Sequence, residues 1–397
     1  MLSQKMLELG KKSSVIREIF EYGNKRRAEI GAENVFDFSL GNPSVPAPEK
    51  VNETIAKLLS EKSSVSLHGY TSAPGDMGVR TSIAENLNKR FNIGAKPELI
   101  YMTCGAAASL TISLNAILNE GEEVIVPTPY FPEYKVFIEK AGGVVTEVPC
   151  KLEDFQLDVQ KIENAINEKT KAIILNSPNN PTGVVFSEES LKALAEILNK
   201  KQAEFGTEIY ILADEPYREL VYGNINVPYI PSIYNRTIVC YSYSKSLSLP
   251  GERIGYIFVS PKNENASDIF AAVCGAGRSL GYVCAPSILQ YTIKECVDCV
   301  TNVEAYQKNR DIFYNFLTKT GYKVISPDGA FYLFVKALED DAAAFCERAK
   351  KHEILIVPSD SFGVSGYVRI SYCVATETIE KSLEGFLKLY NEYNGVK

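Results

Sequence analysis

Residues 208–259 read EIYILADEPYRELVYGNINVPYIPSIYNRTIVCYSYSKSLSLPGERIGYIFV. Three short β-rich segments lie in this stretch: EIYILA from 208, TIVCY from 237 and GYIFV from 255. Runs of branched and aromatic residues of this length are typical of strands. The polar segments ADEPY and YSYSKS follow the first two runs directly, so the stretch predicts strands whose ends carry reactive side chains.

The same rhythm extends upstream. Further β-rich segments are ELIYM from 98, EVIVP from 123, VVTEV from 144 and KAIILN from 171. The stretches between them include Ala106 to Asn119 and Glu188 to Phe205, whose apolar residues recur at helical spacing. Alternating strands and crossover helices predict an α/β fold, with a large domain built on a mainly parallel mixed sheet flanked by helices.

The pattern changes downstream of about residue 285. A long polar helical region is followed by the segments YKVIS, AFYLFVK, ILIVP and YVRISYC, with one helix near 341–351 and a final helix. This order predicts a second, smaller α+β domain. We expect a large domain over 46–285, and a small domain with an N-terminal arm over 1–45 and 286–397. The sequence shows no flexible linker between them, so a ligand cleft is expected at their interface.

Composition narrows the class of protein. The 397 residues carry a formal net charge of −7, which argues against a nucleic-acid partner, because such proteins normally show a basic patch. No apolar run is long enough for a membrane span, and the first residues lack the apolar core of a signal peptide. Nine scattered cysteines fit reduced thiols better than a disulfide framework. We therefore expect a cytoplasmic protein.

One CxxC pair, Cys296 and Cys299, raises the question of a metal or redox site. The chain has only two histidines, His68 and His352, and no second CxxC to complete a ligand set. We interpret the pair as one face of a helix and expect no metal.

Four short segments carry the chemistry, each at the end of a predicted strand, where open α/β sheets bind their ligands. They are TCGAAAS from 103, NSPNNPTG from 176, ADEPY from 213 and YSYSKSLSLPGERIG from 241. Taken singly, each fits an ordinary turn, loop or helix start. All four segments occur together and in this order, which makes it improbable that each is only an ordinary turn, loop or helix start.

From about Phe38 to Arg369 the sequence resembles the class I and II aminotransferases, a family of fold-type I pyridoxal-phosphate enzymes. The resemblance rests on SxSK followed by the GxR of Gly251 to Arg253, and on NPTG. It implies the cofactor pyridoxal 5′-phosphate, a homodimer, and a role in amino-acid metabolism.

The resemblance implies two catalytic groups at neighbouring strand ends. Lys245 matches the lysine that holds the cofactor aldehyde as a Schiff base and, once displaced by substrate, moves a proton. Asp214 matches the carboxylate that keeps the pyridine nitrogen protonated as an electron sink. A solvated lysine and a loop-capping aspartate are the structural alternatives.

Three further residues match those around the cofactor ring. Asn180 and Tyr217 match the groups that hydrogen-bond the cofactor's phenolic oxygen, and the Tyr217 hydroxyl is counted as catalytic. Phe131 matches the aromatic residue that stacks on the ring. Taken alone, Asn180 fits turn chemistry before Pro181 and Phe131 fits core packing.

The cofactor phosphate is expected at the start of a helix, where Gly105 and Ala106 offer free backbone N–H groups. Ser242 and Arg253 would add a hydroxyl and a charged donor. Many relatives carry a polar side chain just after that glycine, whereas this chain has three alanines. Tyr70 matches the tyrosine that reaches the phosphate of the neighbouring subunit, which implies active sites at a subunit interface. An ordinary turn aromatic is the alternative.

For the substrate, Arg369 matches the arginine that clamps the α-carboxylate with a planar fork. Gly41 matches the glycine that lets a loop approach the same carboxylate. Arg278 lies near the position of a second arginine in aspartate aminotransferases, although a helix-surface arginine explains it equally well. Tyr22 is another possible pocket residue. The sequence commits only to an α-amino acid.

The implied reaction is the transfer of an amino group between an α-amino acid and a 2-oxo acid, with ping-pong kinetics. The same residues serve pyridoxal-phosphate-dependent C–S β-lyases and amino-acid decarboxylases, and no motif separates these outcomes. A ligand-sensing domain fused to a DNA-binding module is a non-enzymatic alternative, which we disfavour because the pattern begins close to the first residue of this sequence.

Overall fold

The computed structural model describes residues 2–11 and 14–395. Seven strands form one large sheet in the order β2-β8-β7-β6-β5-β3-β4. Their bounds are β2 (Ile100–Thr103), β3 (Glu123–Thr128), β4 (Val144–Pro149), β5 (Thr170–Asn176), β6 (Tyr210–Asp214), β7 (Thr237–Ser242) and β8 (Gly255–Val259). β8 runs antiparallel to both of its neighbours, and the other pairs are parallel. The predicted mainly parallel mixed sheet is confirmed.

Helices cover both faces of this sheet because successive strand residues point in opposite directions. Ile173 and Ile211 belong to the core on one face, whereas their chain neighbours Ile174 and Leu212 belong to the core on the other. The first face is covered by α3 (Glu49–Glu61), α5 (Met77–Phe91), α8 (Val159–Ala165), α9 (Glu188–Phe205) and α13 (Ser287–Cys296). The second is covered by α6 (Ala106–Ile117), α7 (Glu133–Lys140) and α12 (Ala266–Leu280).

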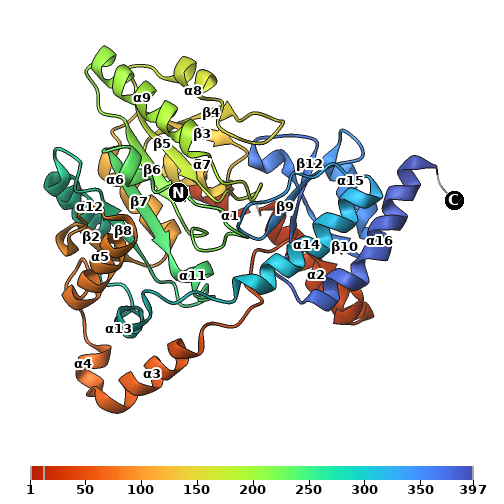
Figure 1. The fold of residues 1–397 in the computed structure, drawn as a ribbon, viewed down its shortest axis with the longest axis horizontal. Helices are drawn as coiled ribbons and strands as arrows, with labels where there is room; N and C mark the ends of the chain where they lie inside the picture. Colours follow the sequence, from red (N-terminus) through yellow and green to blue (C-terminus); the bar gives the residue numbers. More distant parts are fainter. Residues whose placement is uncertain (1, 12–13, 396–397) are drawn as a thin grey trace.

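The C-terminal part of the chain builds a second body beside the large sheet (Figure 1). Its antiparallel sheet has the order β11-β12-β9, and a short parallel pair joins β1 to β10. The strands are β1 (Phe36–Asp37), β9 (Tyr332–Lys336), β10 (Ile354–Leu355), β11 (Val357–Pro358) and β12 (Tyr367–Ser371). The helices are α2 (Val15–Ile30), α14 (Val303–Thr320), α15 (Ala342–Lys350) and α16 (Thr376–Asn394).

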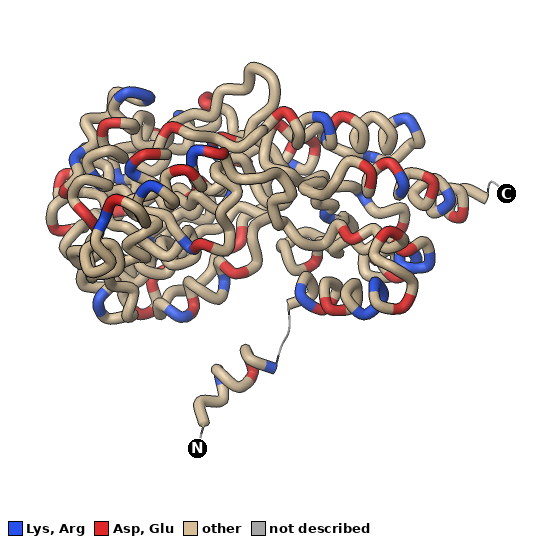
Figure 2. The backbone as a smooth tube through the Cα atoms, turned by 90° about the horizontal axis from the view of Figure 1, so that it is seen from below, with Lys and Arg blue, Asp and Glu red and all other residues tan. Residues whose placement is uncertain are grey.

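The remaining helices are short. They are α1 (Gln4–Lys11), α4 (Ser64–His68), α10 (Ile230–Ile233) and α11 (Tyr243–Ser246), with 3-10 turns at Ala32–Asn34, Pro97–Leu99 and Ser359–Phe362. Figure 2 shows α1 projecting from the body of the molecule, and acidic and basic residues interspersed along the helices of both halves. Within residues 2–11 and 14–395, none of the helices combines the length and the apolar character that crossing a membrane requires.

The predicted domain boundary at 285 stays a prediction. Leu289 and Ile293 of α13 pack in the same core as the large sheet, and α13 contacts α3 and α5. We therefore propose that the large domain extends to about residue 300, where the chain leaves α13 for α14.

Two local predictions were wrong. The segment YKVIS forms no strand of its own, and only Val324 bridges to Val335 of β9. The CxxC pair does not share a helix face, because α13 ends at Cys296 and Cys299 lies beyond it. Both thiols belong to the nine free cysteines of the chain.

Candidate active site

One cavity lies where the carboxyl ends of β5, β6 and β7 meet β9 and β12 of the second body. Most of the predicted site residues line it: Gly41, Ala106, Phe131, Asn180, Asp214, Tyr217, Ser242, Lys245, Arg253 and Arg369. Residues from distant parts of the sequence meet there because parallel strands end at the same edge of the sheet. The roles proposed for them from the sequence remain predictions.

Lys245 lies on α11, which begins directly after β7. Its Nζ donates a hydrogen bond of 2.6 Å to the carbonyl oxygen of Gly41. Burial lowers the pKa of the ammonium group to about 8, and the positive charges of Arg253 and Arg369 act in the same direction. At pH 7 roughly a tenth of this lysine is therefore an uncharged amine, which is far more than for an ordinary lysine, and the uncharged form is the one that a nucleophile requires.

Asp214 ends β6 and is buried. Its Oδ2 accepts a hydrogen bond from the Tyr134 hydroxyl, while its Oδ1 is buried without any hydrogen-bond partner. Burial raises the pKa of this carboxyl group to about 7, although the Tyr134 hydrogen bond opposes that shift. Among the described residues, no cationic side chain neutralises this carboxylate, so a cation is left for a ligand to supply.

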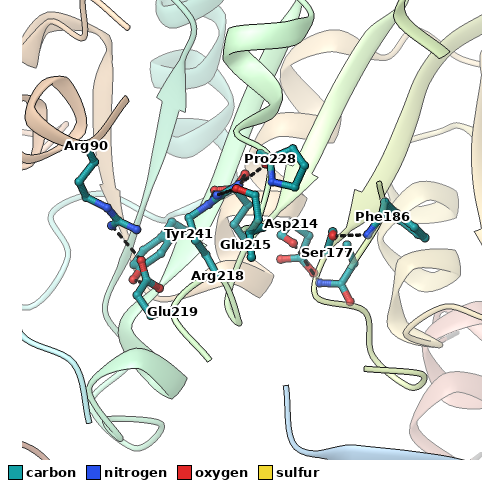
Figure 3. Close-up of polar contacts among 11 residues, drawn as sticks. Arg90, Ser177, Phe186, Asp214, Glu215, Arg218, Glu219, Pro228 and Tyr241 are labelled. Atoms are coloured by element: carbon teal, nitrogen blue, oxygen red, sulfur yellow. Dashed lines mark hydrogen bonds and ion pairs between the residues drawn. The ribbon is translucent and has the colours of Figure 1, made fainter. Parts of the chain in front are cut away.

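Polar contacts fix the segment that follows Asp214 (Figure 3). Arg218 donates to both carboxylate oxygens of Glu215 at 2.6 and 2.5 Å, and to the carbonyls of Val227 and Pro228. The carboxylate of Glu219 accepts from Arg90 and from the Tyr241 hydroxyl. These bonds hold the loop between β6 and α10, so Asp214 and Tyr217 keep fixed positions.

Arg369 on β12 is a buried cation, with 2% of its surface exposed. Its guanidinium donates to Asn180 Oδ1 at 3.1 Å and to the carbonyl of Ser39 at 2.6 Å, while its Nε has no partner. No carboxylate of the described residues lies within ion-pair distance of it. A buried guanidinium without an anion is costly, so this position suits an anionic ligand.

A second anion position lies at the start of α6. Gly105 precedes the helix with φ of 88°, and a side chain there would meet the Arg253 guanidinium. Because α6 begins at Ala106, the amides of its first turn have no acceptor within the helix. Arg253 itself has a positive φ of 51°, a conformation that is unfavourable for a residue other than glycine and that clusters at functional sites.

Hydroxyl groups complete this position. Ser242 Oγ donates to Ser244 Oγ at 2.8 Å, and an Arg253 nitrogen donates to Ser244 Oγ at 3.3 Å. The sequence analysis identified Ser242 and missed Ser244, which is the second serine of SxSK. Its position inside a recognised motif was the available signal.

Aromatic side chains close the cavity. Phe131 lines it and meets Tyr134 edge to face, with ring centroids 5.7 Å apart. The Tyr217 and Tyr332 hydroxyls lie 3.0 Å apart. The sequence analysis missed Tyr134 and Tyr332, together with the lining residues Ile16, Leu40 and Glu133. Tyr134 lies three residues after Phe131 in PYFPEY, whereas no local signal marks Tyr332 or Ile16.

Three residues considered from the sequence lie outside this cavity. Tyr70 follows α4 and is 98% exposed. Arg278 lies on the exposed side of α12, and Tyr22 on α2 packs against Lys350. The structure of one chain therefore leaves the predicted contact of Tyr70 with a second subunit as a prediction.

The charges that face the cavity leave room for two anions. Lys245, Arg253 and Arg369 bring positive charge, whereas Asp214 and Glu133 are the acidic residues of the lining. The two arginines mark separate anion positions, one at the start of α6 and one beside Asn180. The arrangement suits a molecule with a phosphate group, a cationic ring and a reactive carbon, together with a carboxylate substrate.

Comparisons with known proteins point to one family. Residues 33–386 match the pattern of the family described as aminotransferase class I and II. A crystal structure of an amino transferase from Eubacterium rectale is 53% identical, with a TM-score of 0.97, and the match covers 99% of each chain. The aspartate aminotransferase of Thermus thermophilus with maleate is 28% identical, with a TM-score of 0.86 over 98% of this chain and 99% of that one. A probable aspartate aminotransferase of Methanocaldococcus jannaschii is 31% identical, covering 95% of this chain and 96% of the relative.

Proposed function

The chain belongs to the aminotransferase class I and II family of pyridoxal-phosphate-dependent enzymes, and from this membership we propose what each part of the cavity does. Lys245 holds pyridoxal 5′-phosphate, and the enzyme moves an amino group between an α-amino acid and a 2-oxo acid. The observation that carries this proposal is the unpartnered buried oxygen of Asp214 in the same cavity as the half-buried amine of Lys245.

The residues present fit this cofactor. Asp214 lacks a cation, and the pyridine nitrogen in its protonated form supplies one. Arg253 and the first turn of α6 lack an anion, and the phosphate supplies it. We propose that Phe131 covers the ring and that Asn180 and Tyr217 donate to its phenolic oxygen.

The substrate carboxylate fits at Arg369. Its guanidinium already has fixed contacts with Asn180 and Ser39, so a bidentate carboxylate would find the fork oriented. Gly41 lies beside this position, and its carbonyl accepts from Lys245. A substrate bound by Arg369 is therefore held next to the lysine amine.

When bound, pyridoxal phosphate supplies an electron sink that allows the substrate α-carbon to lose a proton. The Nζ of Lys245 would take up that proton and give it back, since its lowered pKa suits both acceptance and donation near neutral pH. Asp214 keeps the ring cationic, and Arg369 fixes the orientation of the α-carbon. The first half-reaction would leave the amino group on the cofactor and, with uptake of water, release a 2-oxo acid; a second 2-oxo acid would then take up that amino group.

Two of the related proteins are named aspartate or probable aspartate aminotransferases. We therefore propose aspartate as the first amino donor to test. A C–S β-lyase or a decarboxylase would use the same lysine and carboxylate, and the experiment below separates these outcomes.

The proposal includes a homodimer in which each copy completes the other's phosphate position. Tyr70 is 98% exposed, and the neighbouring apolar residues Val65 and Met77 are exposed as well. A second copy covering this region would bury them and bring the Tyr70 hydroxyl to its partner's phosphate. Light scattering of the purified protein would test the assembly, and a monomeric mass would contradict it.

We also propose a cytoplasmic location. All nine cysteines are free thiols, including pairs such as Cys296 and Cys299 that are close in sequence. Unpaired thiols in this number are typical of a reducing compartment.

The test is the visible absorbance of the purified protein before and after single amino acids are added anaerobically, without any oxo acid. A cofactor band that bleaches with release of one equivalent of 2-oxo acid supports amino transfer. A band that persists while ammonia, pyruvate or carbon dioxide accumulates identifies a lyase or a decarboxylase instead. No band after addition of pyridoxal phosphate, or an unaltered band in Lys245→Ala, contradicts the proposal.

A further inference from the structure

Tyr332 on β9 touches three parts of the cavity at once. Its hydroxyl lies 3.0 Å from the Tyr217 hydroxyl, and its ring lies under the Arg369 guanidinium, 4.6 Å from the centroid. A side chain at Gly41 would collide with the Tyr332 hydroxyl, so the Gly41 backbone lies directly against it. Tyr332 is 2% exposed, and its hydroxyl faces the cavity instead of water.

The direction of the bond between the two hydroxyls follows from counting protons. Burial raises the pKa of Tyr332 to about 12 and the pKa of Tyr217 well above its usual value, so each keeps its single proton at neutral pH. In the proposed function Tyr217 donates that proton to the phenolic oxygen of the cofactor. Its own oxygen can then only accept, and Tyr332 is the hydroxyl within reach to donate to it.

Resting on the proposed function, we propose that Tyr332 is a positioning residue that donates to Tyr217 and thereby tunes the proton equilibrium of the imine between Lys245 and the cofactor. A donor behind Tyr217 polarises its O–H bond and makes Tyr217 a stronger donor in turn. Stronger donation stabilises the phenolic oxygen as an anion and weakens its hold on the imine proton. Tyr332 thus lowers the pH at which the imine loses that proton.

The structure contains a matched pair of buried tyrosines away from the cavity. The Tyr372 hydroxyl donates to the Tyr222 hydroxyl at 3.1 Å, and both rings are buried in the same small-domain core as Tyr332. Neither residue lines the cavity. Tyr372→Phe removes the same chemical group from the same core, so it measures any general effect of losing a buried phenol.

The experiment uses the cofactor-loaded enzyme. Visible absorbance is titrated with pH for the unaltered chain and for Tyr332→Phe, Tyr217→Phe, the double variant and Tyr372→Phe. Phenylalanine keeps the ring under Arg369 and removes only the hydroxyl. We expect Tyr332→Phe to raise the absorbance midpoint by about half a pH unit in the unaltered background and to leave it unchanged in the Tyr217→Phe background.

Steady-state kinetics give a second readout. Because the ring under Arg369 remains, Tyr332→Phe should lower kcat several-fold and leave KM for the amino acid nearly unchanged. A midpoint that does not move in Tyr332→Phe, or moves equally with and without the Tyr217 hydroxyl, overturns the inference. So does an equal shift in Tyr372→Phe. An unaltered chain that shows no cofactor band contradicts the proposed function itself, and is recognised before any variant is compared.

Discussion

Asp214 and Glu215 are adjacent buried carboxylates, and the protein surrounds them in opposite ways. Glu215 receives two hydrogen bonds from Arg218, whose guanidinium also lies over the rings of Phe91 and Tyr229. Asp214 receives a hydroxyl from Tyr134, and its second oxygen has no partner. Successive side chains point to opposite sides at the end of β6, so Glu215 faces the protein interior and Asp214 faces the cavity.

The buried arginines divide in the same way. Arg218 has its own carboxylate within the chain, whereas Arg369 has only an amide oxygen and a carbonyl. The Arg218 charge is neutralised by Glu215 when the chain folds, whereas the Arg369 charge is left for a ligand to neutralise. Buried charges neutralised within the chain should therefore govern stability, and those left without a partner should govern function. The predictions below test this division.

The largest expected effect is on the functional side. Lys245→Ala should lower the rate of amino transfer by ~10⁴-fold or more, because both the attachment of the cofactor and the proton transfer depend on this amine. The cofactor-free variant should unfold at the same temperature as the unaltered chain or higher, since a half-buried ammonium with a lowered pKa is removed. Single-turnover rates and thermal unfolding measure the two quantities. A loss of stability as large as that of Arg218→Met would break the division.

The second prediction is on the structural side. Arg218→Met should lower the free energy of unfolding by about 3–5 kcal/mol, because the Glu215 carboxylate is left buried without its cation. Urea denaturation of the cofactor-free protein measures this. Lys192→Met is the control, since the exposed pair of Lys192 with Glu188 should contribute less than about 1 kcal/mol. The double variant Glu215→Leu with Arg218→Met should recover part of the loss, and its failure to do so would count against the explanation.

The division also explains what the sequence could predict. Asp214 ends β6 and Lys245 lies three residues after the end of β7, so local β-rich patterns were sufficient to place them at the sheet edge. Tyr332 could not be predicted in this way, because its importance comes from meeting Tyr217, which lies 115 residues away in the chain. The predictions of a shared helix face for Cys296 and Cys299 and of a strand at YKVIS failed for a related reason. Tertiary packing, not local pattern, decides where such elements end.

A third prediction concerns pH. The Asp214 pKa of about 7 lies above its usual value of 3.8, so the folded cofactor-free protein binds one more proton than the unfolded chain between about pH 4 and pH 7. Stability should therefore fall as pH rises through this range, by up to about 1.4 kcal/mol per pH unit from this group. Asp214→Asn should remove this contribution, and so should bound cofactor. Thermal unfolding at several pH values checks both, and parallel curves for the variant and the unaltered chain would be the contrary result.

The smallest expected effect concerns the hydrogen bond that the protein gives to the Asp214 carboxylate, and it is an effect on cofactor affinity. Among the described residues, the Tyr134 hydroxyl is the one that donates to the Asp214 carboxylate, and Tyr134→Phe removes it. Since that bond opposes the upward shift of the Asp214 pKa, the carboxyl should become harder to ionise. A less anionic Asp214 holds a cationic ring more weakly, so the cofactor should dissociate about fivefold more readily, as expected for the loss of one hydrogen bond of about 1 kcal/mol. Tyr130→Phe is the matched control, because the Tyr130 hydroxyl donates to Glu147 at 2.7 Å and not to Asp214. Equal weakening in both variants would show that packing of the two stacked rings, not the charge on Asp214, sets the affinity.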